Sequence, residues 1–72
     1  MMHKHSLDLD GLQTSISLED EFWMALRAIA IKHGLPISKL VKQVTRDRLP
    51  KTTRTSAVRV FVLREYVKAS AT

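Results

Sequence analysis

The chain has 72 residues, a formal net charge of +5 and no cysteine. This length allows one domain with a marginal core, for which oligomerisation commonly supplies the missing burial. The lack of cysteine excludes disulfides, thiolate zinc sites and thiol nucleophiles. No stretch approaches the roughly 20 apolar residues of a membrane span, and no secretory signal is recognisable. We therefore expect a soluble cytoplasmic protein.

The positive charge lies in the second part of the sequence. Up to Leu26 the basic residue Lys4 stands against five acidic residues, whereas from Arg27 onward eleven Lys and Arg accompany two acidic residues. Such a distribution suits a polyanion such as DNA, RNA or an acidic membrane surface. The alternative is that these basic residues simply form solvated helix faces.

The first segment, Met1–Asp10, shows no periodicity and predicts a mobile arm. His3 and His5 could bind a metal ion loosely, but two histidines in a mobile arm rarely form a specific site. We therefore expect no metal site and no cofactor.

A strand is predicted over Leu12–Leu18 because apolar and polar residues alternate there. Its two faces consist of Thr14, Ile16 and Leu18 on one side and Gln13, Ser15 and Ser17 on the other. No second strand follows closely, so both edges of this strand would lack hydrogen-bond partners. Pairing with the same strand of a second chain, antiparallel across a two-fold axis, would satisfy them. The strand therefore predicts a homodimer.

Two helices are predicted after the strand. Acidic residues at 19–21 favour a helix N-terminus, and apolar residues recur after them with helical spacing. Gly34 suits a C-terminal cap. These signals predict a first helix over about 20–33. Pro36 suits the first turn of a second helix and Pro50 stops it, which gives about 36–49.

The last segment, 56–68, is ambiguous between a helix and a buried strand because its middle is rich in valine. Its length and the possible N-cap residues Thr55 and Ser56 favour a helix. Its apolar residues cover most of the circumference, so we expect it to be largely buried in a subunit interface. The predicted fold is mostly α, with the order β-α-α-α. It consists of an arm at 1–10, a domain at 11–68 and a tail at 69–72.

This order of elements resembles the ribbon-helix-helix family, to which the repressors Arc and MetJ belong. The resemblance rests on TSISLEDEFW at 14–23, Gly34-Leu35, and SAVRVFVLREY at 56–66, and is greatest for a bacterial subgroup with an extra C-terminal segment. It covers about 11–67. The family implies an intertwined homodimer whose two strands form an antiparallel ribbon in the major groove of double-stranded DNA. It therefore implies a transcriptional regulator that acts as a repressor.

The resemblance also implies roles for particular residues. The residues expected to face base edges are Gln13, Ser15 and Ser17. The residues expected to contact phosphates, at the N-terminus of the second helix, are Ser38, Lys39 and Lys42. The expected dimer core consists of Thr14, Ile16, Leu18, Phe22, Trp23, Leu26, Leu40, Val44 and Phe61.

Enzymatic function is not expected. No carboxylate pair lies with a histidine in elements that could form a cleft, and two glycines cannot form a Gly-rich phosphate loop. The alternative to DNA binding is a protein-interaction module or an antitoxin-like scaffold. In that case the C-terminal segment, with basic residues such as Arg59 and Arg64, would bind a partner protein.

Overall fold

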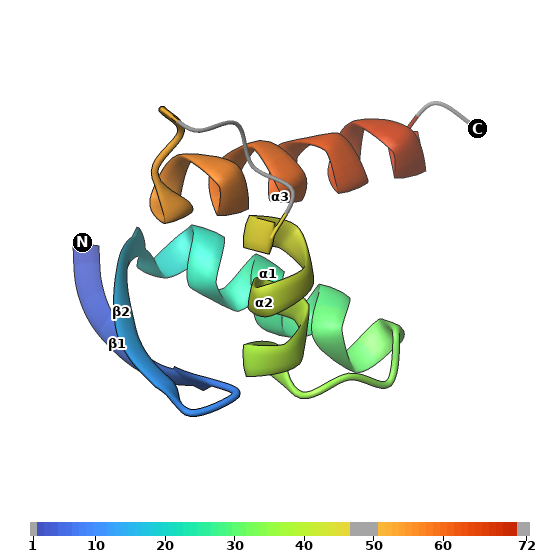
Figure 1. The fold of residues 1–72 in the computed structure, drawn as a ribbon. Coiled ribbons are helices and arrows are strands. Elements are labelled where there is room, and N and C mark those ends of the chain that lie inside the picture. The colour runs from blue at the N-terminus through green and yellow to red at the C-terminus, as the bar shows by residue number, and fades with distance from the viewer. Residues whose placement is uncertain (1, 47–50, 71–72) are drawn as a thin grey trace.

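The computed structural model describes residues 2–46 and 51–70. The elements, in chain order, are β1 (Met2–Leu9), β2 (Leu12–Glu19), α1 (Asp20–Lys32), α2 (Ile37–Arg46) and α3 (Arg54–Ser70). Figure 1 shows the two strands as a hairpin on one side of the helices, with α3 crossing above α1 and α2.

The N-terminal residues form a strand, so the predicted mobile arm is wrong for 2–9. Strand β1 pairs antiparallel with β2, in a register that runs from Leu9 opposite Leu12 to Met2 opposite Glu19. Strand β2 therefore finds a partner within its own chain. The expectation of a single strand without an intrachain partner is corrected to an N-terminal hairpin of two strands.

The hairpin forms because its turn has the required chemistry. Asp10 and Gly11 connect the strands with positive φ angles of 56° and 87°, as in a type I′ turn, whose twist matches that of the flanking strands. The carboxylate of Asp8 accepts a hydrogen bond of 2.7 Å from the amide of Gly11. An Asp-Gly pair between alternating apolar residues is a strong hairpin signal. It was missed here because the arm contains so many polar residues.

Helix α1 confirms the predicted boundaries to within one residue. Gly34 has a φ of 68°, and the amide of Leu35 donates to the carbonyl of Ala30 at 2.9 Å, which is the expected left-handed termination. Helix α2 begins one residue later than predicted, at Ile37. The predicted continuation over 47–49 and the stop at Pro50 lie outside the described residues.

The ambiguous segment is a helix. Its N-cap is Thr53, rather than Thr55 or Ser56, because the Thr53 hydroxyl accepts a hydrogen bond of 3.1 Å from the amide of Ser56. The helix continues through Ser70, so it includes two residues that were assigned to the tail, whereas 71–72 lie outside the described residues. Within one chain only one side of α3 is buried, and its expected burial in a subunit interface remains a prediction.

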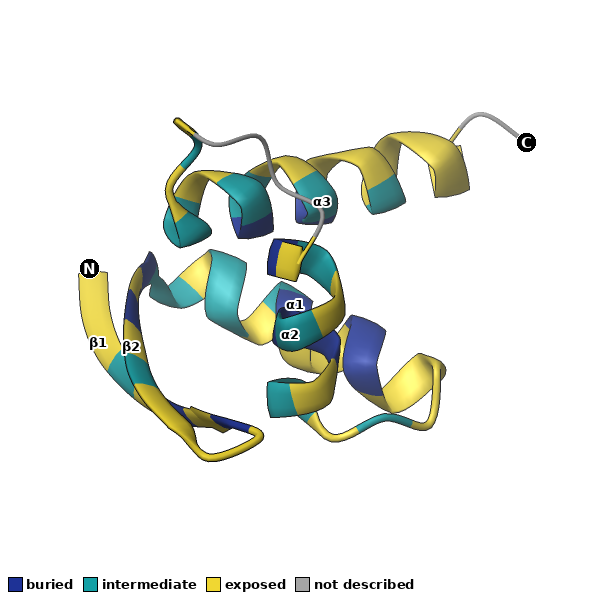
Figure 2. Ribbon diagram, in the orientation of Figure 1, coloured by how far each residue is buried: buried dark blue, intermediate teal, exposed yellow. Residues whose placement is uncertain are grey.

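A single apolar core lies between the hairpin and the helices. Each strand contributes two buried side chains, and all three helices contribute the rest. The buried apolar residues are Leu7, Leu9, Ile16, Leu18, Leu26, Ile29, Ala30, Leu40, Val41, Val58 and Val62. Figure 2 shows the buried positions of β2, α1 and α3 turned towards the middle of the molecule and the outer side of α3 exposed. The core is thus built from one chain.

Leu26 provides a test of this core, because its side chain is fully buried. Replacing Leu26 with Ala is expected to lower the free energy of unfolding by about 2–5 kcal/mol, through lost burial and the cavity left behind. Urea denaturation followed by circular dichroism measures this change. The control is Gln43→Ala, at an exposed position of α2, which should change the free energy of unfolding by less than about 0.5 kcal/mol. Equal effects of the two substitutions would contradict the assigned core.

Candidate nucleic-acid interface

The outer face of the hairpin is polar over most of its length. Alternation places Lys4, Ser6 and Asp8 of β1 on the same exposed face as Gln13, Ser15 and Ser17 of β2. Directly opposite one another are Lys4 and Ser17, Ser6 and Ser15, and Asp8 and Gln13. The structure therefore brings the three predicted base-contacting residues together on one exposed face. It adds three residues of β1 that the sequence analysis had assigned to a mobile arm.

The chemistry of this face suits hydrogen bonding to base edges. Its hydroxyls and the Gln13 amide can each donate and accept hydrogen bonds, and glutamine can pair bidentately with adenine. The single cation, Lys4, is balanced by the single anion, Asp8. The face itself therefore has little net attraction for phosphate, and affinity for DNA would have to come from basic residues elsewhere.

The second edge of β2 is partly open. Along an antiparallel ladder, pairs that exchange backbone hydrogen bonds alternate with pairs that do not. The pair that closes the turn is hydrogen-bonded, so Gln13, Ser15 and Ser17 belong to the pairs that are not. Their backbone groups therefore point away from β1. Consistent with this, the carbonyl of Ser17 accepts a hydrogen bond of 3.3 Å from the hydroxyl of Thr55 in α3. Among the described residues, no hydrogen bond occupies the outward backbone groups of Gln13 and Ser15. A further strand could pair there.

An ion pair holds α3 against the end of β2. Arg59 donates through Nε at 3.0 Å and through Nη2 at 2.8 and 2.9 Å to the carboxylate of Glu19. The guanidinium carbon also lies 6.0 Å from the centre of the Phe22 ring, within reach of a cation–π interaction. Hydrogen bonding to its own backbone, followed by the bond from Arg59, lowers the pKa of Glu19. Arg59, suggested above as a contact for a partner protein, is thus engaged within its own chain.

Two histidines of β1 join the hairpin to α1. His3 Nδ1 is hydrogen-bonded to the carboxylate of Asp20, and this bond lowers the pKa of Asp20. The ring of His5 stacks on Trp23, with ring centres 3.7 Å apart and an interplanar angle of 6°. Both histidines therefore contact residues at the start of α1.

The three predicted phosphate contacts lie in the first turns of α2. Ser38 is half-buried and Lys39 is exposed, whereas Lys42 forms an ion pair with Asp10 of the hairpin turn. This pair places α2 beside the turn. Because ion pairs between exposed side chains are weak, Lys42 can exchange Asp10 for a phosphate.

The amides at the N-terminus of α2 are partly engaged within the chain. The amides of Lys39 and Leu40 both donate to the carbonyl of Pro36, at 3.1 Å. Within the described part of the chain, the amides of Ile37 and Ser38 donate to no backbone carbonyl. These two amides remain for an anion.

The residues predicted for the dimer core already pack within one chain. Those that are buried are Ile16, Leu18, Leu26 and Leu40, and those that are half-buried are Thr14, Phe22, Trp23, Val44 and Phe61. Their contacts between chains remain a prediction.

Two further observations concern residues 2–46 and 51–70 only. No helix there is both long and apolar enough to cross a membrane. No three His, Asp or Glu side chains converge there as metal ligands would.

Comparison with known proteins gives one match. A profile of the ribbon-helix-helix domain matches residues 2–66, from the first residues of β1 almost to the end of α3. No curated protein and no solved structure matches the chain.

The hydrogen bonds that lower the pKa values of Glu19 and Asp20 predict a dependence of stability on pH. Both pKa values lie below their ordinary values of 4.5 and 3.8 in the folded chain. The stabilisation is therefore fully present above these ordinary values and is lost as the pH falls through the lowered pKa values. Urea denaturation between pH 7 and pH 2 should show a smaller loss of stability for Glu19→Gln and Asp20→Asn than for the unchanged chain.

The control for this experiment is Glu21→Gln. Glu21 is exposed and makes no ion pair with any described residue. This variant should follow the pH profile of the unchanged chain. If Glu19→Gln and Asp20→Asn follow it as well, the hydrogen bonds of these two carboxylates do not stabilise the fold.

Proposed function

The chain belongs to the ribbon-helix-helix family, and on that premise we propose that it is a homodimeric, sequence-specific DNA-binding regulator of transcription that acts as a repressor. The family consists generally of DNA-binding regulators and antitoxins and is typically non-catalytic. The observation that supports DNA binding by this chain is the exposed polar face of its hairpin, on which Gln13, Ser15 and Ser17 lie side by side.

The dimer that we propose is formed across the free edge of β2. The backbone groups of Gln13 and Ser15 in β2 would pair with those of β2 in the second chain. This is the contact between strands that was predicted from the sequence, but because each chain contributes two strands, the dimer would contain a sheet of four. The two β2 strands would be central. The major groove is about 12 Å wide and admits two strands. The twist between neighbouring strands would tilt the outer β1 strands away from the groove floor, so that Lys4 faces the phosphates of the groove wall.

Phosphate contacts would come from α2. Lys39 is exposed, Lys42 lies at the hairpin turn, and the amides of Ile37 and Ser38 lie at the positive end of the helix dipole. These groups would position the protein on DNA without reading sequence. They would also supply the positive charge that the hairpin face does not have.

One observation favours a second candidate function. The outer side of α3 exposes apolar residues, Val60, Leu63 and Val67, at 44, 61 and 59 %. An exposed apolar helix face is typical of protein interaction, as in an antitoxin-like scaffold that binds a partner protein.

Gln13 tests the proposed reading face. Gln13→Ala should relax base preference at one position of each half-site and cost roughly 1–3 kcal/mol for the preferred site, if the amide pairs bidentately. Selection of binding sites from random DNA, followed by affinity measurements on the selected site, gives both quantities. The control is Gln43→Ala, which removes the same side chain from an exposed position of α2. Unchanged preference and affinity in Gln13→Ala would exclude this strand face as the reader.

Lys39 tests the proposed phosphate contact. Lys39→Ala should weaken specific and random DNA about equally and reduce the slope of log affinity against log salt by about two units, because the dimer loses two phosphate contacts. Affinities measured across a salt series give the slope. The control is Lys68→Ala, which removes another exposed lysine, near the end of α3. The same slope for Lys39→Ala, Lys68→Ala and the unchanged chain would place α2 away from DNA.

A further inference from the structure

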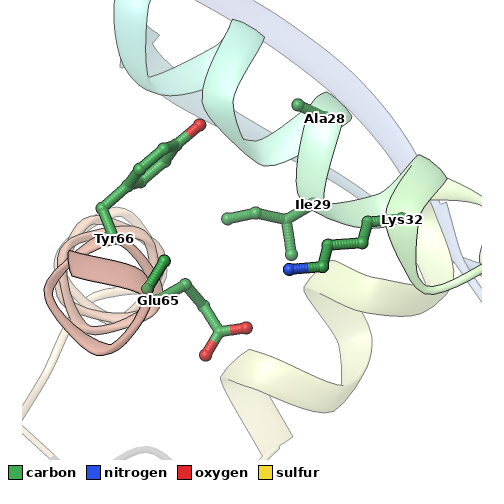
Figure 3. A pocket seen from close by; sticks show the side chains of 6 residues that line it. Ala28, Ile29, Lys32, Glu65 and Tyr66 are labelled. Carbon is green, nitrogen blue, oxygen red and sulfur yellow. The ribbon is translucent and has the colours of Figure 1, made fainter. Parts of the chain in front are cut away.

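A small cavity lies between the C-terminal halves of α1 and α3. Its volume is about 130 Å³. Figure 3 shows α1 on one wall of the cavity and Glu65 and Tyr66 of α3 on the other. The lining residues are Ala28, Ile29, Lys32, Glu65, Tyr66 and Ala69. None of these lining residues belongs to the hairpin or to α2, so the cavity is separate from the candidate nucleic-acid interface.

Small residues create this cavity. Ala28 of α1 and Ala69 of α3 end at Cβ and are exposed, whereas Ile29 is buried. Because protein interiors are otherwise close-packed, two alanines on facing helices leave a space that longer side chains would fill. Since the lining alanines are exposed, this space is open to solvent and a ligand can enter it.

The cavity has a charged end and an apolar end. Figure 3 shows the ammonium of Lys32 and the carboxylate of Glu65 towards one end, and Ala28 with the ring of Tyr66 towards the other. Small-molecule sites have this character, because apolar walls enclose the ligand and a few polar groups fix its orientation.

The two charged groups have binding capacity that the chain does not use. The ammonium of Lys32 forms no hydrogen bond or ion pair with any described residue, Glu65 included. The Oε1 atom of Glu65 lies 3.5 Å from Nε2 of His33, which leaves the second carboxylate oxygen to a ligand. A positive and a negative group therefore lie at one end of the cavity without pairing with each other.

The opposite signs of these groups determine the charge of a suitable ligand. An anion would be attracted by Lys32 and repelled by Glu65, and a cation would meet the reverse. A ligand that carries one charge of each sign can bind both residues through charge-assisted hydrogen bonds. The charged end of the cavity is therefore complementary to a zwitterion.

The volume of the cavity limits the size of the ligand. An apolar cavity of about 150 Å³ holds a benzene molecule, so this cavity has room for about six to eight non-hydrogen atoms. An α-amino acid with a small aliphatic side chain has this size. It carries both charges at one end and an apolar group at the other, as the cavity does.

We propose that this cavity binds a free α-amino acid with a small aliphatic side chain. The ammonium of Lys32 would donate to the ligand carboxylate, and the ligand ammonium would donate to the carboxylate of Glu65. The ligand side chain would lie against Ile29 and the ring of Tyr66. This inference goes beyond the proposed function and does not depend on it.

The proposed ligand would bridge two helices. Its charged groups would bind one residue of α1 and one residue of α3, which meet at this site only in the folded chain. A ligand that binds the folded chain but not the unfolded chain raises the stability as its concentration rises. Because the ligand is small and the site is open, we expect a dissociation constant of about 1 mM.

NMR titration of the ¹⁵N-labelled chain with L-valine tests the inference. The amide signals of Ala28, Lys32 and Ala69 should shift and reach saturation, whereas those of Ser6 and Ser15 on the outer face of the hairpin should stay constant. The melting temperature should rise with the concentration of L-valine. Shifts that do not saturate, or that are as large on the hairpin as at the cavity, would overturn the inference.

Two analogues of the ligand test the need for both charges. Isobutylamine lacks the carboxylate of valine, and isovalerate lacks its ammonium. Each should bind at least about tenfold more weakly than L-valine, because each loses one charge-assisted interaction and keeps one repulsive charge. Either analogue binding as tightly as L-valine would contradict a site for a zwitterion.

Matched substitutions test the two charged residues. Lys32→Gln and Glu65→Gln should each weaken L-valine binding at least about fivefold. The controls are Lys68→Gln and Glu21→Gln, the same changes at exposed positions outside the cavity, which should bind like the unchanged chain. If all four variants bind L-valine equally, the charged end of the cavity is not the site.

A third substitution fills the cavity without changing its charge. Ala28→Leu keeps a good helix former at this position and places a larger side chain in the space that the ligand would occupy. L-valine binding should be lost, while the dispersion of the NMR spectrum shows that the chain is folded. A folded Ala28→Leu variant that binds L-valine as tightly as the unchanged chain would place the ligand outside this cavity and overturn the inference.

Discussion

The antiparallel ladder between β1 and β2 is the interaction on which the rest of the structure depends. It satisfies the backbone groups of β2 along one edge and fixes the faces of both strands, because a shift of one residue would exchange the two faces. In the observed register Leu7, Leu9, Ile16 and Leu18 all face the helices. The same register assembles the polar outer face. Core and candidate interface are thus opposite sides of one ladder.

The junction between β2 and α1 connects this ladder to α1 and α3. Glu19 binds Arg59 of α3, Asp20 binds His3 of β1, and Trp23 stacks on His5. These contacts surround the first turn of α1, so the orientation of the hairpin is coupled to that of α3. A ligand on the outer face of the hairpin and a partner on α3 would therefore act on one connected unit.

The candidate site was predicted in part. Alternation in β2 identified Gln13, Ser15 and Ser17 as one face, because a period of two requires no tertiary information. Lys4, Ser6 and Asp8 were not predicted, because they join that face only through the pairing of the strands. The contact between Lys42 and Asp10 joins residues 32 positions apart, which no local pattern reveals.

The sequence alone determined α1 and α2, because helical spacing, a capping glycine and proline act locally, but it did not identify Leu7 and Leu9 as core residues. It also contained the Asp-Gly turn that determines the hairpin. Length and capping residues favoured a helix for the final segment, but its valines also suit a strand, and only the tertiary structure decided which side of this helix is buried. The tertiary structure also decided where apolar residues remain exposed. Burial depends on the position of neighbouring elements, and α3 exposes Leu63 and Val67 because only one of its sides packs against the rest of the chain.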